Sequence, residues 1–122
     1  MTLQRYELGI VGENLAVDVL AARGYAILER RYRTDHGEID IIALDGETLV
    51  FVEVRAKATA EFGTAAESVT PEKQRRVVRM ASVYLARHSL ADRPCRFDVV
   101  AIDDALSEEP VITVYPGAFD AF

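Results

Sequence analysis

The sequence predicts an α/β fold in which helices cover a central mixed β-sheet. Three observations lead to this prediction: a helical apolar period near the N-terminus, three strand-like segments in succession, and a second helical segment followed by two more strand-like segments. A strand, a crossover helix and a further strand are typical of layered folds, and the crossover is right-handed where the two strands are parallel. The 122 residues suit one domain with its own hydrophobic core, spanning residues 1–122.

The first helix is expected over residues 7–23. Its apolar residues recur at helical spacing, and they are Leu8, Val11, Leu15 and Val19. Gly24 follows them, which is typical of a helix that ends in a left-handed cap. Gly9 and Gly12 lower the helical propensity of the first turns, so they either permit a close backbone approach or mark a frayed start.

Five strands are expected, at residues 26–33, 38–44, 48–57, 96–102 and 111–115. Asp45-Gly46-Glu47 is a hairpin signal between the second and the third. A long connection over residues 58–69 leads to a second helix from Pro71 to about residue 88, because Thr70 is a favourable N-cap and proline suits the first turn. The predicted core-facing stripe of this helix consists of Val77, Met80, Ala81 and Tyr84.

The net charge of −6 is unevenly distributed. Residues 70–96 carry seven basic and two acidic side chains, whereas the segments on either side are acidic. A basic block in an acidic protein is typical of an anion-binding face, and here a stripe of Arg75, Arg76 and Arg79 would present it. An arginine-rich helix face that contacts only water is the alternative, and charge alone favours neither.

The sequence disfavours several classes of protein. No apolar run approaches the roughly 18 residues of a membrane span, and the N-terminus does not read as a secretory signal, so a cytoplasmic protein without a membrane partner is expected. Cys95 is the single cysteine and has no partner at catalytic spacing. Phosphate-loop, dinucleotide-binding and zinc motifs are absent from the sequence, and His36 is expected at the surface in a turn.

Asp40 and Glu53 are the residues that most clearly indicate a functional site. The hairpin brings their strands together, and side chains alternate in direction along a strand. A loop at residues 46–47 places Asp40 opposite Glu53, and a loop at residues 45–46 places the two acids on a diagonal. In both registers they share one face, and Ile42 is expected on the same face as Asp40.

Neighbouring carboxylates within apolar strands repel each other, and burying them without a partner is unfavourable. A divalent cation such as Mg²⁺ would compensate them, because it prefers oxygen ligands. An ion-pair cluster with Arg55, Lys57 or Arg33 is the alternative. Glu13 favours the metal, since it shares a face with apolar residues of the first helix, although the helix dipole also favours an acid near a helix start.

Six segments together resemble the YraN family of small bacterial proteins. They are Gly9-Ile-Val-Gly-Glu-Asn-Leu-Ala16, Gly24-Tyr-Ala-Ile-Leu28, Gly37-Glu-Ile-Asp-Ile-Ile42, Leu49-Val-Phe-Val-Glu-Val54, Phe62-Gly63 and Arg96-Phe-Asp-Val-Val100. Each segment alone is weak, but the combination is specific and covers residues 9–100. The family looks like a small member of the restriction-endonuclease-like, PD-(D/E)xK superfamily, and within it is similar to archaeal Holliday-junction resolvases.

The resemblance implies a restriction-endonuclease-like core and hydrolysis of phosphodiester bonds in DNA with Mg²⁺ or Mn²⁺. It implies that Asp40 and Glu53 bind the metal and that Glu13 completes the site, directly or through water. The second helix would bring its first turn to the same pocket. With the basic stripe, the implied nucleic-acid-binding set is Lys73, Gln74, Arg75, Arg76 and Arg79.

The sequence departs from the family pattern at Arg55, because it reads Glu53-Val54-Arg55 where Glu-x-Lys is usual. Arginine stays protonated and cannot act as a general base, but it can hold a phosphate or orient a water. Lys57 lies two residues further on the same strand face and could supply an ammonium group. The expected catalytic set is therefore Glu13, Asp40, Glu53, Arg55 and Lys57.

Three functions stay open on the sequence. The preferred one is a metal-dependent endonuclease that acts on DNA, with branched or damaged DNA as its candidate substrate. A non-catalytic nucleic-acid-binding module that retains the nuclease fold is the second, favoured by Arg55 and the negative net charge. The third is a protein-interaction subunit that uses the acidic segment from Asp98 onward. On the resolvase analogy a homodimer is expected, because such an enzyme meets two strands.

Overall fold

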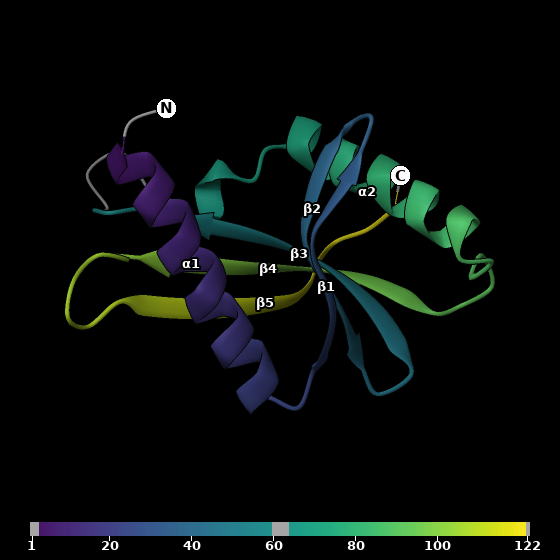
Figure 1. The fold of residues 1–122 in the computed structure, drawn as a ribbon, viewed down its shortest axis with the longest axis horizontal. Helices are drawn as coiled ribbons and strands as arrows, with labels where there is room; N and C mark the ends of the chain where they lie inside the picture. The colour runs from purple at the N-terminus through teal and green to yellow at the C-terminus, as the bar shows by residue number, and fades with distance from the viewer. Residues whose placement is uncertain (1–2, 60–63, 122) are drawn as a thin grey trace.

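A computed structural model describes residues 3–59 and 64–121 of the chain (Figure 1). The helices are α1 Leu3–Ala22, the short η1 Ala66–Ser68 and α2 Pro71–Arg87. The strands are β1 Ala26–Thr34, β2 Gly37–Asp45, β3 Thr48–Ala56, β4 Cys95–Asp103 and β5 Val111–Phe119. Phe62 and Gly63, which form one of the family-like segments, lie outside the described residues. No helix within the described ranges is long and apolar enough to cross a membrane.

The five strands form one sheet in the order β1-β2-β3-β4-β5. β3 and β4 are parallel, and the other neighbouring pairs are antiparallel. α2 lies in the connection between the two parallel strands and covers one face of the sheet, while α1 covers the other (Figure 1). The predicted α/β fold, with helices on a central mixed sheet, is confirmed and is consistent with a restriction-endonuclease-like core.

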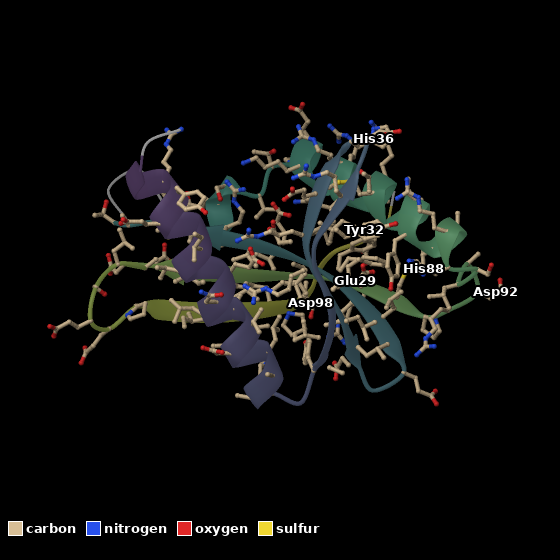
Figure 2. All side chains as sticks on the ribbon, viewed as in Figure 1. Glu29, Tyr32, His36, His88, Asp92 and Asp98 are labelled. Carbon is tan, nitrogen blue, oxygen red and sulfur yellow. The ribbon has the colours of Figure 1, made fainter. Side chains whose placement is uncertain are left out.

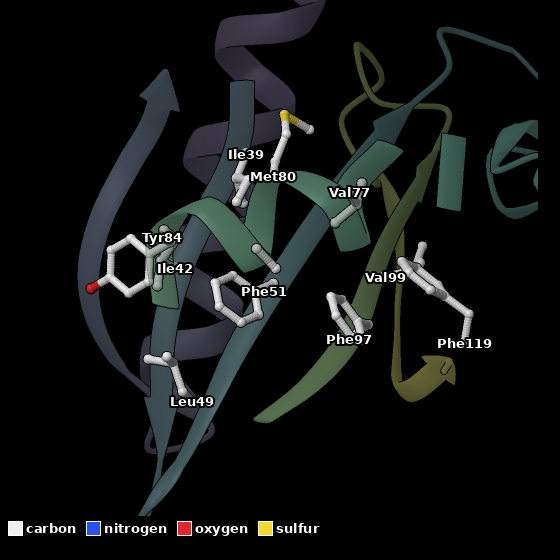
Figure 3. Close-up of a cluster of buried hydrophobic side chains, with 11 residues drawn as sticks. Ile39, Ile42, Leu49, Phe51, Val77, Met80, Tyr84, Phe97, Val99 and Phe119 are labelled. Atoms are coloured by element: carbon white, nitrogen blue, oxygen red, sulfur yellow. The ribbon is translucent and has the colours of Figure 1, made fainter. Parts of the chain in front are cut away.

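Two apolar cores fill the spaces between the helices and the sheet. The core beneath α2 contains all four residues of the predicted stripe and side chains from four strands (Figure 3). Phe51 lies at its centre, with ring centroids 5.8 Å from Tyr84 and 5.7 Å from Phe97. The core beneath α1 contains Ala16 and Leu20 together with residues of β2, β3 and β4. The predicted stripe of α2 is therefore confirmed, whereas in α1 the buried apolar residues are Ala16 and Leu20, and the periodic Leu8, Val11, Leu15 and Val19 are only partly buried.

The ends of both long helices agree with their capping signals. Thr70 caps α2, because its Oγ1 accepts a hydrogen bond from the Lys73 N–H at 3.3 Å, and Pro71 is the first helical residue. Gly24 follows α1 with a φ of +91°, a left-handed conformation that glycine adopts without strain. α1 begins at Leu3, four residues before the expected start.

The two glycines in α1 have different surroundings. A Cβ atom on Gly12 would lie 2.7 Å from the Cβ of Ala56, so this glycine permits α1 to approach β3 closely. A Cβ atom on Gly9 would meet nothing within 4 Å. The close-approach interpretation therefore holds for Gly12, and Gly9 faces open space.

The last strand is longer than expected, since it ends at Phe119 rather than at residue 115. Its pairing with β4 shifts between Val99↔Tyr115 and Phe97↔Phe119, where Pro116 and a left-handed Gly117 form an irregularity. The sequence predicts that the strand ends before these two residues. They are tolerated because β5 lies at the edge of the sheet, where proline need not donate a hydrogen bond to a further strand.

A buried carboxylate joins several elements on the α1 side of the sheet. Asp98 is fully buried and accepts hydrogen bonds from the Tyr25 hydroxyl at 2.9 Å, the Arg96 Nε at 2.8 Å and the Gly117 N–H at 2.9 Å (Figure 2). These partners come from the connection between α1 and β1, from β4 and from β5. The acid is therefore fully paired and acts as a structural link.

Candidate active site

The candidate site lies where the sheet forks. β2 pairs with β3 only through residues 41–45 and 48–52, around a two-residue loop at residues 46–47. Beyond these pairs β2 continues along β1, and β3 continues along β4. Asp40 on β2 and Glu53 on β3 are the first residues beyond the last pair of these two strands. The first of the two expected registers is therefore the one that the chain adopts.

Asp40 lies in the opening of the fork. Its Oδ2 accepts a hydrogen bond from the Val54 N–H at 2.8 Å, so a side chain satisfies a backbone donor that β2 no longer pairs. The carboxyl of Glu53 lies within hydrogen-bonding reach of the same carboxylate. The structure thus brings the two acids together, as the hairpin predicts.

The prediction that side chains alternate regularly in direction along β2 is wrong at Asp40. Ile39 and Ile42 both pack beneath α2, whereas an uninterrupted strand would turn them to opposite faces. The physical cause is Arg31 on β1, which lies across from Asp40 in the register of their neighbours and has a φ of +53°. A left-handed residue interrupts the pleat, so both strands change phase where β2 leaves β3.

Burial raises the pKa of both carboxyls. The pKa of Asp40 rises to about 6 because burial disfavours its charged form; the Val54 N–H opposes this rise and the Glu13 charge adds to it. The pKa of Glu53 rises to about 8 because of burial and of the neighbouring Asp40 charge, and only 12% of its side chain is exposed. Near neutral pH the pair therefore retains a proton.

Arg55 and Lys73 are the cations that act on Glu53. The Arg55 Nη1 lies 3.6 Å from the Glu53 Oε1, and the Arg55 Nε donates a hydrogen bond to the Ser68 Oγ at 2.9 Å. The charges of Arg55 and Lys73 both oppose the rise in the pKa of Glu53. Burial and the Arg55 charge lower the pKa of Lys73. The first turn of α2 therefore brings Lys73 close to Glu53.

The remaining candidate residues are Lys57, Gln74 and the arginines of α2, and their surroundings differ from those of Arg55 and Lys73. The backbone N–H of Lys57 donates to the Ile102 carbonyl at 2.9 Å, and within the described ranges this lysine is not among the residues that line the cavity beside Asp40. The Gln74 Nε2 donates to the Val69 carbonyl at 3.2 Å. The basic stripe is exposed along α2 and consists of Arg75, Arg76 and Arg79. This stripe is therefore accessible to an anion from solvent.

Glu13 is held by two neighbouring arginines of β1. Its Oε1 accepts from the Arg30 Nε at 2.8 Å and its Oε2 from the Arg31 Nε at 2.7 Å, and 10% of its side chain is exposed. Successive residues of a regular strand point to opposite faces, but the left-handed φ of Arg31 allows both side chains to reach α1. Glu13 is thus close enough to act on Asp40 electrostatically, while both of its oxygens are engaged.

An open cavity of about 600 Å³ lies between the N-terminal half of α1 and the fork. Its exposed lining includes Tyr6, Gly9, Arg31 and Arg33. Its more buried lining includes Gly12, Glu13, Asp40, Val54 and Ala56. The candidate acid Asp40 is therefore recessed from the rim. His36, by contrast, lies exposed at the tip of the β1–β2 hairpin (Figure 2).

The residues at the fork fit a hard divalent cation held by two side chains. Mg²⁺ is often bound by one or two carboxylates while water and phosphate oxygens complete its coordination. Among the residues that the structure describes, no group of three or more His, Cys, Asp and Glu side chains could hold a metal ion. Asp40 and Glu53 are the two candidate ligands, and metal binding by them and by Glu13 stays a prediction.

Sequence reasoning missed the clamp of Arg30 and Arg31 on Glu13, the hydroxyl of Ser68 on Arg55, and the rim residue Tyr6. The clamp depends on a backbone angle, which no side-chain pattern reveals. Ser68 lies in η1, inside a segment that reads only as a connection. These contacts form between elements far apart in the chain, so the sequence carries no local signal for them.

Known proteins resemble this chain over most of its length. The family model described as "Uncharacterised protein family UPF0102" matches residues 12–102. A UPF0102 protein of Moorella thermoacetica is 48% identical over 120 residues, which cover 98% of this chain and 100% of the relative. One of Symbiobacterium thermophilum is 50% identical over 96 residues, which cover 79% and 81% of the two chains. The chain therefore belongs to the UPF0102 family, which is the YraN family that its six segments resemble.

Proposed function

We propose that the chain is an endonuclease that hydrolyses phosphodiester bonds in DNA with Mg²⁺ or Mn²⁺, and that Asp40 and Glu53 hold the metal. The observation that carries the proposal is the pair of recessed carboxyls at the fork, with Arg55 and Lys73 beside them. A pair of carboxyls with cations beside it suits a phosphodiester, because the acids would hold the metal and the cations would attract the phosphate.

The residues divide the chemistry between them. Hydrolysis joins a water oxygen to phosphorus, breaks one P–O bond, and leaves the water proton on the departing sugar oxygen. A bound Mg²⁺ supplies Lewis acidity toward the phosphate. Arg55 stays protonated and offsets charge that develops on the phosphate oxygens. Lys73 adds a second positive charge close to Glu53.

Four further parts of the proposal concern the substrate, the assembly and the residues around the site. Branched or damaged DNA is the proposed form of the substrate, and a homodimer is the proposed assembly, since both follow from the likeness to resolvases. Glu13 supports the site by fixing Arg31 beside Asp40. The exposed stripe of Arg75, Arg76 and Arg79 contacts the DNA backbone outside the fork.

A non-catalytic nucleic-acid-binding module is the second candidate. The observation that favours it is Arg55 in the position where the motif usually has lysine, held by both Glu53 and Ser68. Such a module would bind DNA in a salt-sensitive way without metal and would release no product.

The test is cleavage of end-labelled linear, flapped and four-way-junction DNA in Mg²⁺, Mn²⁺ or EDTA. The wild-type chain is compared with Asp40→Asn and Glu53→Gln, and with Asp92→Asn as a matched control at an exposed acid. We expect both site variants to lose activity by about 100-fold or more, above the loss typical of residues that only support metal ligands. The control should cut like the wild type.

Cutting that persists in both site variants would show that the activity belongs to another site or to a contaminant. DNA binding without cutting by the wild-type chain would favour the non-catalytic module. In that case Arg55→Lys would be the next variant, because it restores the usual motif while leaving the acids in place.

A further inference from the structure

The cavity beside Asp40 is large enough for one nucleotide of a single strand. Its volume of about 600 Å³ lies in the range of small-ligand sites in proteins. Exposed side chains form its rim, and half-buried or buried residues, including Asp40, form its floor. A duplex carries its phosphates on the outside of a wide cylinder, whereas a single strand can bend into such a recess. A phosphate therefore approaches Asp40 most directly on an unpaired strand.

Gly9 leaves a gap in the wall that α1 contributes. A Cβ atom at this position would have no neighbour within 4 Å, so space beside the helix is open. The residue lines the cavity and lies in the helix, where alanine would give higher stability. A larger side chain at this position would enter the cavity without a clash against the protein. The gap is therefore available to a ligand.

The rim next to Gly9 carries an aromatic ring and guanidinium groups. Tyr6 is 57% exposed although it lies beside the cavity, so its ring can stack on a base. Arg31 uses its Nε for Glu13, and a guanidinium has terminal N–H groups that can also bind a phosphate. Arg33 lines the same rim. A flat ring and fixed cations around one gap are the groups that bind single-stranded nucleic acid.

We propose that this cavity receives one unpaired nucleotide of the DNA, with the base on Tyr6, the sugar in the gap at Gly9 and the phosphate on Arg31. The chain would then select unpaired or branched DNA over continuous duplex. This inference rests on the proposed function for the role of Asp40, and it goes further because it names the nucleotide-binding cavity and the residues that would select unpaired DNA.

The test measures binding rather than cleavage, so it is independent of the metal. An end-labelled oligothymidylate and a continuous duplex of the same length are titrated with protein in EDTA, and fluorescence anisotropy is read. The variants are Gly9→Leu, which fills the gap, and Tyr6→Ala, which removes the ring. The matched controls are Ala21→Leu near the opposite end of α1 and Tyr115→Ala at another exposed tyrosine. Thermal melting checks that each variant is folded.

We expect tighter binding of the single strand than of the duplex. Gly9→Leu and Tyr6→Ala should each weaken single-strand binding about ten-fold, as loss of a stacking aromatic does, while Tyr6→Phe and both controls bind like the wild type. Equal affinity for the two DNAs would overturn the inference, as would unchanged binding by folded Gly9→Leu and Tyr6→Ala. Tighter binding of an oligouridylate than of the oligothymidylate would overturn the assignment to DNA.

The outcome separates this inference from the proposed function. If the chain shows the expected binding pattern but never cuts, the nuclease proposal fails and the nucleotide site stands. If the chain cuts duplex and unpaired DNA equally well through Asp40, the nuclease proposal stands and the nucleotide site fails.

Discussion

Asp40 and Glu53 carry carboxyls whose surroundings disfavour ionisation. Burial raises the pKa of both, and the Asp40 charge raises that of Glu53 further. A pair of this kind weakens the fold at pH values where both groups ionise. Perturbed carboxyls in a recess are typical of functional sites, where binding of a cation or substrate offsets the repulsion.

At the residue scale we predict that Glu53→Gln changes how stability depends on pH. The ordinary pKa of a glutamate is about 4.3, whereas that of Glu53 in the folded chain is about 8. Between these values the folded state binds more protons than the unfolded state, so the free energy of unfolding falls as pH rises. The stabilisation is complete below the ordinary pKa and is lost as pH passes through the raised pKa. The variant should therefore show a smaller loss of stability from pH 5 to pH 9.

Urea unfolding in EDTA across this pH range measures the effect. Glu109→Gln, at an exposed acid, is the matched control and should follow the wild type. Parallel curves for wild type and Glu53→Gln would contradict the raised pKa. In Mg²⁺ at the alkaline end, the proposal predicts that the wild type gains more stability than Glu53→Gln, because a metal held by Asp40 and Glu53 would stabilise only the folded state.

At the scale of the element, α1 depends on where its two glycines lie. Gly12 contacts the sheet through its bare backbone, and this contact sets the distance between α1 and the strand that carries Glu53. Gly9 lies one turn earlier and faces the cavity. Glycine at position 12 thus permits close packing, whereas glycine at position 9 leaves space beside the helix.

We predict that Gly12→Ala destabilises the chain and that Gly9→Ala does not. The Cβ at position 12 would lie 2.7 Å from the Cβ of Ala56, so helix and sheet must separate, which costs about 1 to 3 kcal/mol. At position 9 the added methyl meets nothing, and the gain in helix propensity stabilises the chain by about 0.5 to 1 kcal/mol.

Chemical denaturation of the two alanine variants measures this difference, and each serves as the control for the other. Equal effects of the two substitutions would contradict the close approach of α1 to β3. Loss of activity in Gly12→Ala, where no functional group is removed, would show that the spacing of α1 over the fork matters to the site.

At the scale of the whole molecule, a carboxylate connects distant segments. Asp98 on β4 accepts hydrogen bonds from Tyr25, which follows α1, and from Gly117 on β5. Arg96 donates to Asp98 and also pairs with Asp45 at the β2–β3 hairpin, 3.0 Å away. The network therefore ties the first helix, the central strands and the edge strand into one body.

We predict that Asp98→Ala destabilises the chain by about 3 kcal/mol or more, because it leaves Arg96 and the Tyr25 hydroxyl without their buried partner. Asp45→Ala is the matched control. It removes a half-exposed partner of the same arginine and should cost less than about 1 kcal/mol. Equal losses in thermal melting would contradict a central role for Asp98.

The sequence by itself determined the order and type of the two long helices and the five strands, the apolar stripe of α2 and the placement of the two acids on neighbouring strands. Apolar periods, the Thr70 cap and the hairpin signal act over a few residues, so they can be read without the fold. The stripe of α2 was predicted residue by residue, and the first hairpin register places Asp40 beside Glu53.

Only the tertiary structure decided how these parts form a site. The phase change at Arg31, the clamp on Glu13 and the approach of Lys73 to Glu53 all depend on contacts between segments distant in the chain. The extension of β5 through Pro116 likewise depends on its edge position. Local patterns cannot encode these features, because a left-handed backbone angle or a recessed charge is stable only when several elements enforce it together.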